Sequence, residues 1–347
     1  MRPVDDLVVH LGVPHTAARR LARALGQLRP QLRDRAVAYV PGEAADRADG
    51  PASYADRLQD RATAERRRTA TRAGARQTVL VCDDALLGPA ALPGQPNRWY
   101  PQARALVEPL VAALAPVRTT VLLVVRRQDR WLERQYLDDV LHDSAAAFAD
   151  WLATLPSTAP DHADLASRLA GTPGVDRLSV LPYESAGSDP TRLVGRVLTA
   201  VGVGEDVPLL GLTGRPPRPV CTRRWLAVAR ALNAELETAD ERRLVRSFIL
   251  RTFPVEADRL DLLERPQRRA LLASCSEPNR ELFRRYLPAA DPSAYADDAA
   301  TERLAALPPG GPGEGTARVG LTARAFRRWD DAPAWTRRAA RVVRRRG

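Results

Sequence analysis

Five short apolar runs, rich in β-branched residues, alternate along the chain with stretches of helical periodicity, and this alternation constrains the fold more than any other feature. The runs are Leu7–Leu11, Ala36–Val40, Thr78–Cys82, Thr119–Val125 and Leu178–Leu181. Continuous apolar runs of this length are typical of strands that are buried on both faces, as in a parallel sheet covered by helices. The sequence therefore predicts an α/β fold with a parallel sheet of about five strands flanked by helices.

Helical stripes lie between and after these runs. Apolar side chains recur at helical spacing after the first and the fourth run, at Leu21, Leu25 and Leu28 and at Leu132, Tyr136 and Val140. Asp189 and Pro190 form an N-cap followed by proline at the first helical position, and Gly202 closes the same helix. From Cys221 to about Leu287 the pattern is helical throughout, which predicts a helical C-terminal part.

Composition divides the chain into three parts. Residues 1–290 form one predicted α/β domain, of which 221–290 is mostly helical, and residues 291–316 are a Pro/Gly-rich linker. Residues 317–347 form a basic helical tail with ten arginines and two aspartates, a net charge of +8 out of the chain's +11. This tail either contacts an acidic surface or a partner protein, or is a solvated helix docked on its own domain.

Cysteine usage and hydropathy limit the compartment and the type of site. The three cysteines, Cys82, Cys221 and Cys275, are an odd number in a chain without a secretory signal, which indicates reduced thiols and a cytoplasmic location. No apolar run is long enough to span a bilayer, so no transmembrane segment is expected. The four histidines show no metal-ligand spacing, so we expect no metal site.

Two segments at predicted strand ends can carry chemistry. The first run ends in the turn His10–Thr16 and continues into the helix that contains Leu21. Free backbone N–H groups and the positive end of the helix dipole make such a turn an anion site. The fourth run ends in Arg126, which is either a phosphate ligand or a solvated loop arginine.

The order of these parts resembles the bacterial sulfotransferases that use 3′-phosphoadenosine 5′-phosphosulfate (PAPS), which have a P-loop-like α/β fold. That family opens with a pattern close to His-x-Gly-x-x-Lys-Thr-Gly-Thr-Thr-x-Leu-Gln, where this chain has the segment His10–Leu21. The family's fourth strand ends in an arginine, followed eight residues later by serine and then x-Tyr; Arg126, Arg134 and Tyr136 stand at these positions. The segment Asp161–Glu184 is similar to the stretch around the family's fifth strand, and the resemblance runs from about residue 5 to 290.

The resemblance implies transfer of a sulfuryl group from PAPS to a hydroxyl of a carbohydrate or small metabolite. It implies that the 5′-phosphosulfate is held by Gly12, His15, Thr16 and Arg19, and the 3′-phosphate by Arg126 and Arg134. His15 would stabilise charge on the leaving group. Asp84, in a turn similar to the family's Ser-x-Glu, would deprotonate the acceptor, or would instead be an N-cap. Trp99 and Tyr100 either line the acceptor cleft or belong to the core.

The loop departs from the family's pattern. The family's lysine is replaced by His15, its glycine by Ala17, and the serine after the fourth strand by Arg134. Protonated histidine and arginine still donate to oxyanions, but the Cβ of an alanine crowds a close backbone approach. Three interpretations follow: an active sulfotransferase, a catalytically inactive sulfotransferase-fold scaffold or regulatory protein, or a binder of acidic surfaces or nucleic acid through the arginine tail.

Overall fold

The computed structural model describes residues 5–13, 16, 18–42, 51–69, 76–91, 98–156, 158–186, 190–203, 223–238, 240–242, 262–288 and 295. These residues form two compact units. The first contains the described residues of Met1–Trp131, Leu155–Arg215 and Pro266–Ala296, and the second contains those of Leu132–Thr154 and Pro216–Arg265. Apart from residue 295, the predicted linker and tail lie outside the described residues, so both stay predictions.

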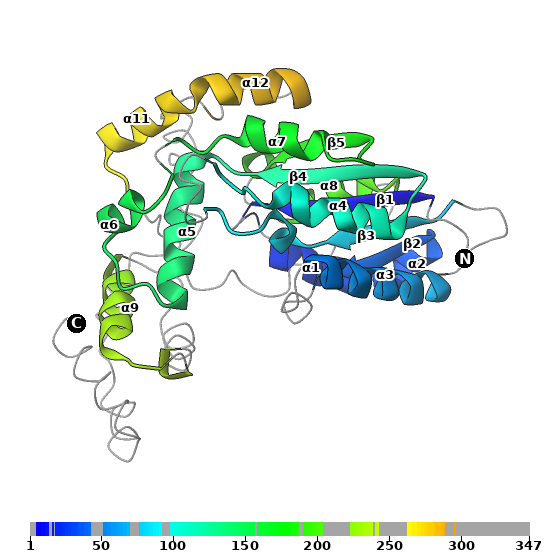
Figure 1. The fold of residues 1–347 in the computed structure, drawn as a ribbon, viewed down its shortest axis with the longest axis horizontal. Helices are drawn as coiled ribbons and strands as arrows, with labels where there is room; N and C mark the ends of the chain where they lie inside the picture. The colour runs from blue at the N-terminus through cyan, green and yellow to red at the C-terminus, as the bar shows by residue number, and fades with distance from the viewer. Residues whose placement is uncertain are drawn as a thin grey trace, which may run out of the picture. The chain divides into compact units, whose positions relative to one another are not determined.

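The first unit is built on a five-stranded sheet whose strands are all parallel (Figure 1). The strands are β1 (Asp6–Gly12), β2 (Val37–Pro41), β3 (Thr78–Cys82), β4 (Arg118–Val125) and β5 (Arg177–Pro182). Their order in the sheet is β2-β3-β1-β4-β5. Each predicted strand differs from the observed one by at most one residue at either end, so the predicted α/β fold with a parallel sheet is confirmed.

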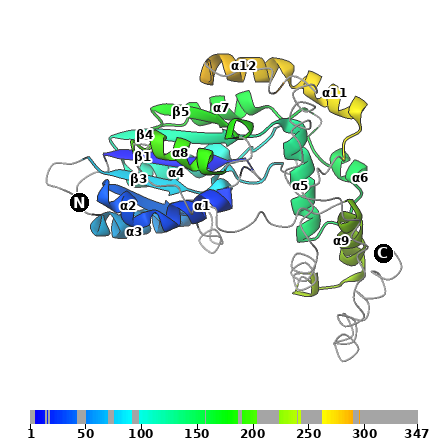
Figure 2. The ribbon, with the colours of Figure 1, turned by 180° about the vertical axis from the view of Figure 1, so that it is seen from behind.

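Helices cover both faces of this sheet, as the two opposite views show (Figures 1 and 2). One face carries α1 (Ala18–Gln27), α2 (Arg29–Asp34) and α8 (Pro190–Ala200). The opposite face carries α4 (Ala103–Leu114) and α7 (His162–Ala170), with α3 (Pro51–Arg68) packed against α4 and β2. The sheet is therefore a buried middle layer, which explains why its strands are apolar on both sides.

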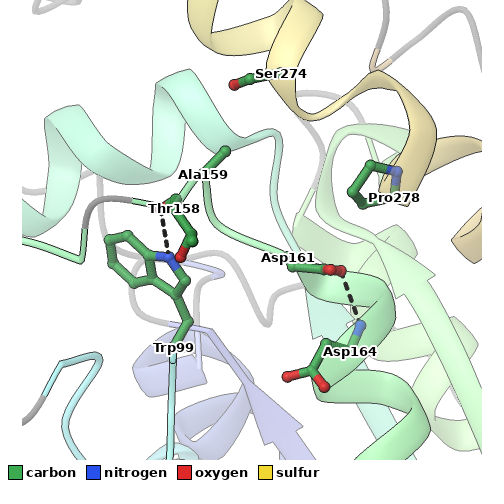
Figure 3. Close-up of a pocket in the computed structure, with 7 residues that line it drawn as sticks. All are labelled: Trp99, Thr158, Ala159, Asp161, Asp164, Ser274 and Pro278. Atoms are coloured by element: carbon green, nitrogen blue, oxygen red, sulfur yellow. Dashed lines mark hydrogen bonds between the residues drawn. The ribbon is translucent and has the colours of Figure 1, made fainter. Parts of the chain in front are cut away.

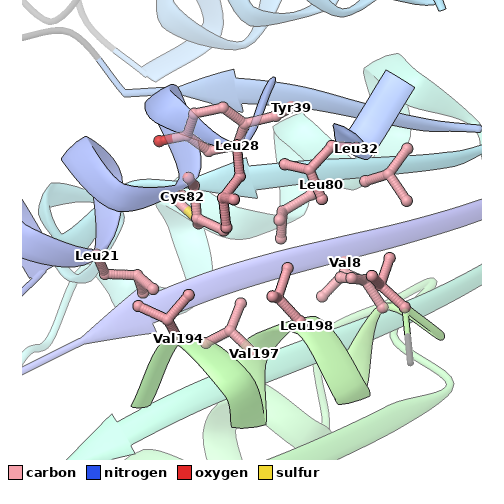
Figure 4. Packing of buried hydrophobic residues seen from close by; sticks show 14 of the residues in the cluster. Val8, Leu21, Leu28, Leu32, Tyr39, Leu80, Cys82, Val194, Val197 and Leu198 are labelled. Carbon is pink, nitrogen blue, oxygen red and sulfur yellow. The ribbon is translucent and has the colours of Figure 1, made fainter. Parts of the chain in front are cut away.

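The leucine stripe predicted after the first strand lies in the core on the α1 and α8 face. Leu21, Leu25 and Leu28 are all buried there, in one cluster with strand side chains and with Val197 and Leu198 of α8. Figure 4 shows Leu21 and Leu28 within this cluster. The helix predicted before Gly202 is α8, whose apolar stripe faces α1. Its predicted N-cap, Asp189, lies outside the described residues.

Two helices from late in the sequence, α11 (Arg265–Ser274) and α12 (Ser276–Tyr286), contribute to the first unit. α12 packs against α7 and β5 (Figure 1). Its attachment includes a buried amide pair, in which the Gln128 Nε2 group donates to Asn279 Oδ1 at 2.6 Å and Asn279 Nδ2 donates to Gln128 Oε1 at 3.2 Å. Residues 151 apart in sequence are thereby joined.

The described part of the second unit is helical. It contains α5 (Gln128–His142) from residue 132 onward, α6 (Phe148–Ala153) and α9 (Arg223–Glu235). The rings of Tyr136, Phe148 and Trp151 pack with centroids 5.0–5.9 Å apart. From residue 221 onward the described residues form helices and contain no strand, in agreement with the predicted helical C-terminal part.

Candidate functional site

The carboxyl end of β1 lies where the direction of the chain across the sheet reverses. After β1 the chain crosses to the edge strand β2 and then returns to β3, which lies between β2 and β1. After β3 it crosses over β1 in the opposite direction to form β4. In open α/β sheets, ligands bind outside the carboxyl ends of the strands at such a reversal. We therefore expect a ligand site at the turn between β1 and α1.

That turn is tight, and hydrogen bonds hold it. The Val13 N–H donates to the Val124 carbonyl of β4 at 3.0 Å, and the Thr16 N–H and hydroxyl both donate to the Val13 carbonyl, at 3.3 and 2.8 Å. A Cβ added at Gly12 would overlap the Thr16 hydroxyl, so glycine at this position lets that hydroxyl reach the Val13 carbonyl. The predicted site residues Gly12 and Thr16 thus lie together just before the N-terminus of α1, where anions bind favourably.

The remaining loop residues of the prediction are not described in the same detail. His15 and the side chain of Arg19 lie outside the described residues, so their roles stay predictions. Asp84 begins η2 (Asp84–Leu87) directly after β3, but its side chain is also outside the described part. Its predicted role as a general base, or as a cap, is therefore untested.

Asp83, the neighbour of Asp84, is a buried carboxylate that the sequence analysis did not single out. Its side chain accepts a hydrogen bond from the hydroxyl of Tyr54 in α3. Its N–H donates to the carbonyl of His10 at 3.1 Å, which continues the pairing of β3 with β1. Asp83 therefore anchors α3 to the end of β3. A carboxylate directly after an apolar run is the signal from which this anchor was predictable.

His10 lies two residues before the end of β1 at Gly12, and its imidazole is buried. The side chain is 1% exposed, and burial lowers its pKa to about 4, opposed by a hydrogen bond to its own backbone. The ring is therefore neutral at physiological pH. Its Nε2 atom is buried without a hydrogen-bond partner.

Arg126 follows the carboxyl end of β4, beside the β1 turn. Gly12 pairs with Val124 in the register of β1 and β4, so Arg126 comes two residues beyond the partner of Gly12. Its guanidinium lies over the ring of Tyr183, with 5.0 Å between Cζ and the ring centroid, and its carbonyl oxygen is 2.8 Å from His162 Nε2. The side chain of Arg126 is half-buried against Tyr183 and is thus not that of a freely solvated loop arginine.

The next arginine, Arg127, has its side chain committed to the protein interior. Its guanidinium donates two hydrogen bonds to Asp129, at 2.6 and 2.7 Å, and Arg268 of α11 donates to the same carboxylate at 3.1 Å. Burial by itself would raise the pKa of Asp129, but the arginines around it outweigh burial and lower that pKa below its usual value. The side chain of Arg127 is therefore held by Asp129, whereas that of Arg126 lies over the ring of Tyr183.

Glu184 supports the backbone at this strand end. Its carboxylate accepts from the N–H of Arg127 at 2.9 Å and from the hydroxyl of Tyr295 at 2.7 Å. Arg134, the second predicted 3′-phosphate residue, lies on α5 within the second unit, whereas Gly12, Thr16 and Arg126 belong to the first. The first unit thus brings together three of the predicted cofactor residues.

A small pocket of about 280 Å³ lies in the first unit, near the start of α7 (Figure 3). It is lined by Trp99, Thr158, Ala159, Asp161, Asp164, Ser274 and Pro278. Asp161 caps α7 by accepting from the N–H of Asp164 at 2.8 Å, and the Trp99 indole donates to the Thr158 carbonyl at 3.0 Å. Trp99 is 5% exposed and Tyr100 2% exposed, so both are core residues, although Trp99 also reaches the pocket.

Comparisons of the chain with known family models, with curated proteins and with solved structures found no match. None of the described helices is long and apolar enough to cross a membrane. Within the described ranges there is also no group of three or more histidine, cysteine, aspartate or glutamate side chains suited to hold a metal ion. The class of protein that the structure defines is therefore an α/β protein with a parallel sheet and a tight β1–α1 turn at its carboxyl edge.

Proposed function

We propose that the protein is a sulfotransferase-like nucleotide-binding protein that binds PAPS, or its desulfonated product 3′-phosphoadenosine 5′-phosphate (PAP), at the β1–α1 turn. The observation that carries the proposal is the turn at Gly12 and Thr16, which opens α1 at the reversal point of the sheet with Arg126 at the adjacent strand end. A phosphate at a helix N-terminus is favoured by the free N–H groups and the helix dipole.

The residues at this edge suit the two ends of such a nucleotide. Gly12 lets the Thr16 hydroxyl lie close against the backbone, which keeps the turn before α1 tight. Arg126 would meet the 3′-phosphate, because guanidinium groups bind phosphate through paired hydrogen bonds. Gly12, Thr16, His15 and Arg19 would hold the 5′-phosphosulfate.

PAPS supplies the sulfuryl group that a transfer reaction would use. In an active protein the bond between the sulfur and the 5′-phosphate oxygen would break, a bond from the sulfur to the acceptor oxygen would form, and Asp84 would take the acceptor proton. His15 would stabilise the charge that develops on the phosphate oxygen. Such a reaction depends on in-line placement and charge neutralisation more than on covalent help from the protein.

The pocket at the start of α7 is our candidate for the acceptor. Asp161 of this pocket directly precedes His162, whose ring contacts the Arg126 carbonyl, so pocket and strand end are linked within one unit. The described lining includes two carboxylates and no basic side chain. This lining suits an acceptor that carries hydroxyl or amino groups, such as a carbohydrate.

Titration of the chain with PAP tests the nucleotide site, and Arg126→Ala is the informative variant. We expect a loss of about 1.5–3 kcal/mol in PAP binding, roughly 10- to 150-fold in Kd, the usual scale for a charged hydrogen bond. Adenosine 5′-phosphosulfate, which lacks the 3′-phosphate, should bind the variant and the wild type alike. Arg118→Ala is the matched control, because Arg118 lies at the opposite end of the same strand, paired with Asp6 at 2.8 Å. If Arg126→Ala weakens the binding of both nucleotides equally, Arg126 does not bind the 3′-phosphate.

We expect little or no sulfuryl transfer by the wild type, because His15 stands where the family has its loop lysine. The loss of one donor to the transition state lowers the rate by about 10²–10³. The triple variant His15→Lys, Ala17→Gly, Arg134→Ser should raise PAPS affinity and allow slow PAPS hydrolysis to be measured. His142→Lys, which adds a lysine elsewhere in the chain, controls for the added charge. Robust transfer by the wild type would contradict the inactive interpretation, whereas no nucleotide binding by the triple variant would contradict the site itself.

A further inference from the structure

One peptide group just beyond the end of β4 is held by side chains rather than by the sheet. β4 pairs with β1 as far as Val124 and with β5 as far as Val125, whose partner Pro182 has no N–H to extend the ladder. The peptide group that follows joins Arg126 to the buried Arg127. Its carbonyl and its N–H therefore need partners from outside the ladder, because a buried backbone group without a partner is costly.

Two side chains from different elements supply these partners. Nε2 of His162, the first residue of α7, lies 2.8 Å from the Arg126 carbonyl oxygen. A carbonyl oxygen only accepts, so Nε2 carries the proton of the ring and donates the bond. His162 is 2% exposed and burial lowers its pKa, so the ring is neutral at physiological pH. On the other side of the peptide group, the Arg127 N–H donates to Glu184 Oε1 at 2.9 Å.

Glu184 belongs to a short segment that also contacts the Arg126 side chain. Tyr183, the residue before it in η3 (Tyr183–Ala186), has its ring under the guanidinium, with 5.0 Å between Cζ and the ring centroid. The second carboxylate oxygen of Glu184, Oε2, accepts from the hydroxyl of the buried Tyr295 at 2.7 Å. Both carboxylate oxygens are thus engaged, and two adjacent residues fix the backbone and the side chain at the end of β4.

We propose that His162 and Glu184 are positioning residues, which preorganise the Arg126 guanidinium for a ligand phosphate at the carboxyl edge of the sheet. Fixing the peptide group after Arg126 fixes the ψ angle of that residue and so limits the directions that its side chain can take. A guanidinium that is already in place loses less conformational entropy when it binds. The inference rests on the proposed function for the phosphate, but not for the position of the guanidinium. No proton or covalent bond is transferred.

Two substitutions of Glu184 separate positioning from a general contribution to stability. Glu184→Leu removes the acceptor of the Arg127 N–H, whereas Glu184→Gln keeps a carbonyl oxygen for it. We expect Glu184→Leu to weaken PAP binding by about 5- to 30-fold, a part of the loss expected for Arg126→Ala. Glu184→Gln should stay within about threefold of the wild type. Adenosine 5′-phosphosulfate, which lacks the 3′-phosphate, should bind all three proteins alike.

The matched control is Asp176→Leu. The Asp176 carboxylate also accepts from an N–H of β4, that of Thr119 at 2.7 Å, but at the opposite end of the strand. Its loss should therefore leave PAP affinity unchanged. In the Arg126→Ala background, Glu184→Leu should change PAP affinity by less than about twofold, because the guanidinium that it positions is already absent.

The position of the guanidinium is also measurable without any nucleotide. The ring current of Tyr183 should shift the side-chain proton signals of Arg126 upfield in the wild type, and these signals are identified by their loss in Arg126→Ala. The shift should persist in Glu184→Gln and disappear in Glu184→Leu and in His162→Phe, which removes the donor to the carbonyl. If Glu184→Leu does not fold, His162→Phe and Glu184→Gln decide the question.

The outcomes distinguish this inference from the proposed function. If Glu184→Leu weakens PAP binding no more than Asp176→Leu does, or equally with and without Arg126, the inference is overturned and the nucleotide site stands. If the proton signals respond as expected but no protein binds PAP, the positioning is supported and the PAPS assignment is overturned. Proton signals that stay unchanged in both Glu184→Leu and His162→Phe overturn the inference.

Discussion

At the scale of single residues, two buried ionisable groups near the ends of neighbouring strands have opposite surroundings. Asp129 has no exposed surface and lies among Arg127, Arg130 and Arg268, which keep its pKa low although burial alone would raise it. His10 is equally buried, but its Nε2 has no partner within the described chain, and burial lowers its pKa to about 4. The first arrangement neutralises its buried charge within the protein, which is typical of a structural role, whereas the second leaves one buried ring nitrogen without a partner among the described residues.

The pKa of His10 predicts how stability depends on pH. The unfolded chain carries this histidine with its ordinary pKa of 6.5, and the folded chain with a pKa of about 4. Between these values the unfolded state binds more protons, so the contribution is complete above about pH 6.5 and is lost as the pH falls toward 4. The free energy of unfolding of the wild type should therefore fall relative to that of His10→Phe by about 3 kcal/mol between pH 7 and pH 4.

Urea titrations of both proteins at several pH values measure this difference. His162 is also buried with a lowered pKa, but it is present in both proteins, so its effect cancels. Parallel pH profiles for the two proteins would contradict the neutral, buried state of His10.

At the scale of elements, the strands were predictable because each is a local apolar run that is buried on both faces. The separation of α1 from α2 was not predicted, because the leucine stripe continues through Leu28 and Leu32 while the chain breaks at the start of α2, where a proline stands in its first turn. The docking of α12 on α7 was not predictable either. The attachment of α12 also includes the pair formed by Asn279 and Gln128 of α5, two polar residues far apart in sequence whose pairing no local pattern indicates.

This amide pair gives a prediction for the attachment of α12. Asn279→Ala leaves the buried Gln128 amide without its main partner, which should cost about 1–3 kcal/mol of stability. The double variant Gln128→Leu, Asn279→Leu removes both polar groups and should be less destabilised than the sum of the two single leucine variants. Chemical unfolding of the four leucine-series proteins gives the coupling energy. Additive effects would show that the pair does not stabilise the attachment.

At the scale of the whole molecule, the sequence predicted at which strand ends the candidate residues lie, but not which residues around them are buried. The positions of Gly12, Thr16 and Arg126 follow from the rule that ligand residues come at the carboxyl ends of parallel strands. The complete burial of His10 did not follow, because burial depends on which helix covers which face of the sheet. The arginine-rich residues 317–347 are a separate question, since their charge of +8 contrasts with the nearly balanced remainder of the chain.

Deletion of residues 316–347 tests that contrast. The described strands and their covering helices form a layered core without this segment. The melting temperature of the shortened protein should therefore lie within about 3 °C of that of the full chain, which corresponds to a change in the free energy of unfolding of less than about 1 to 2 kcal/mol. Binding to an acidic matrix such as heparin should be lost with the deletion, and in the full chain it should weaken steeply as salt is added. If the deletion variant keeps its PAP affinity but no longer binds heparin, the tail has a binding role that is separate from the nucleotide site. A large fall in the melting midpoint would instead show that the apolar stripe at Trp335, Ala339 and Val342 packs into the folded body, and the predicted boundary at residue 316 would be wrong.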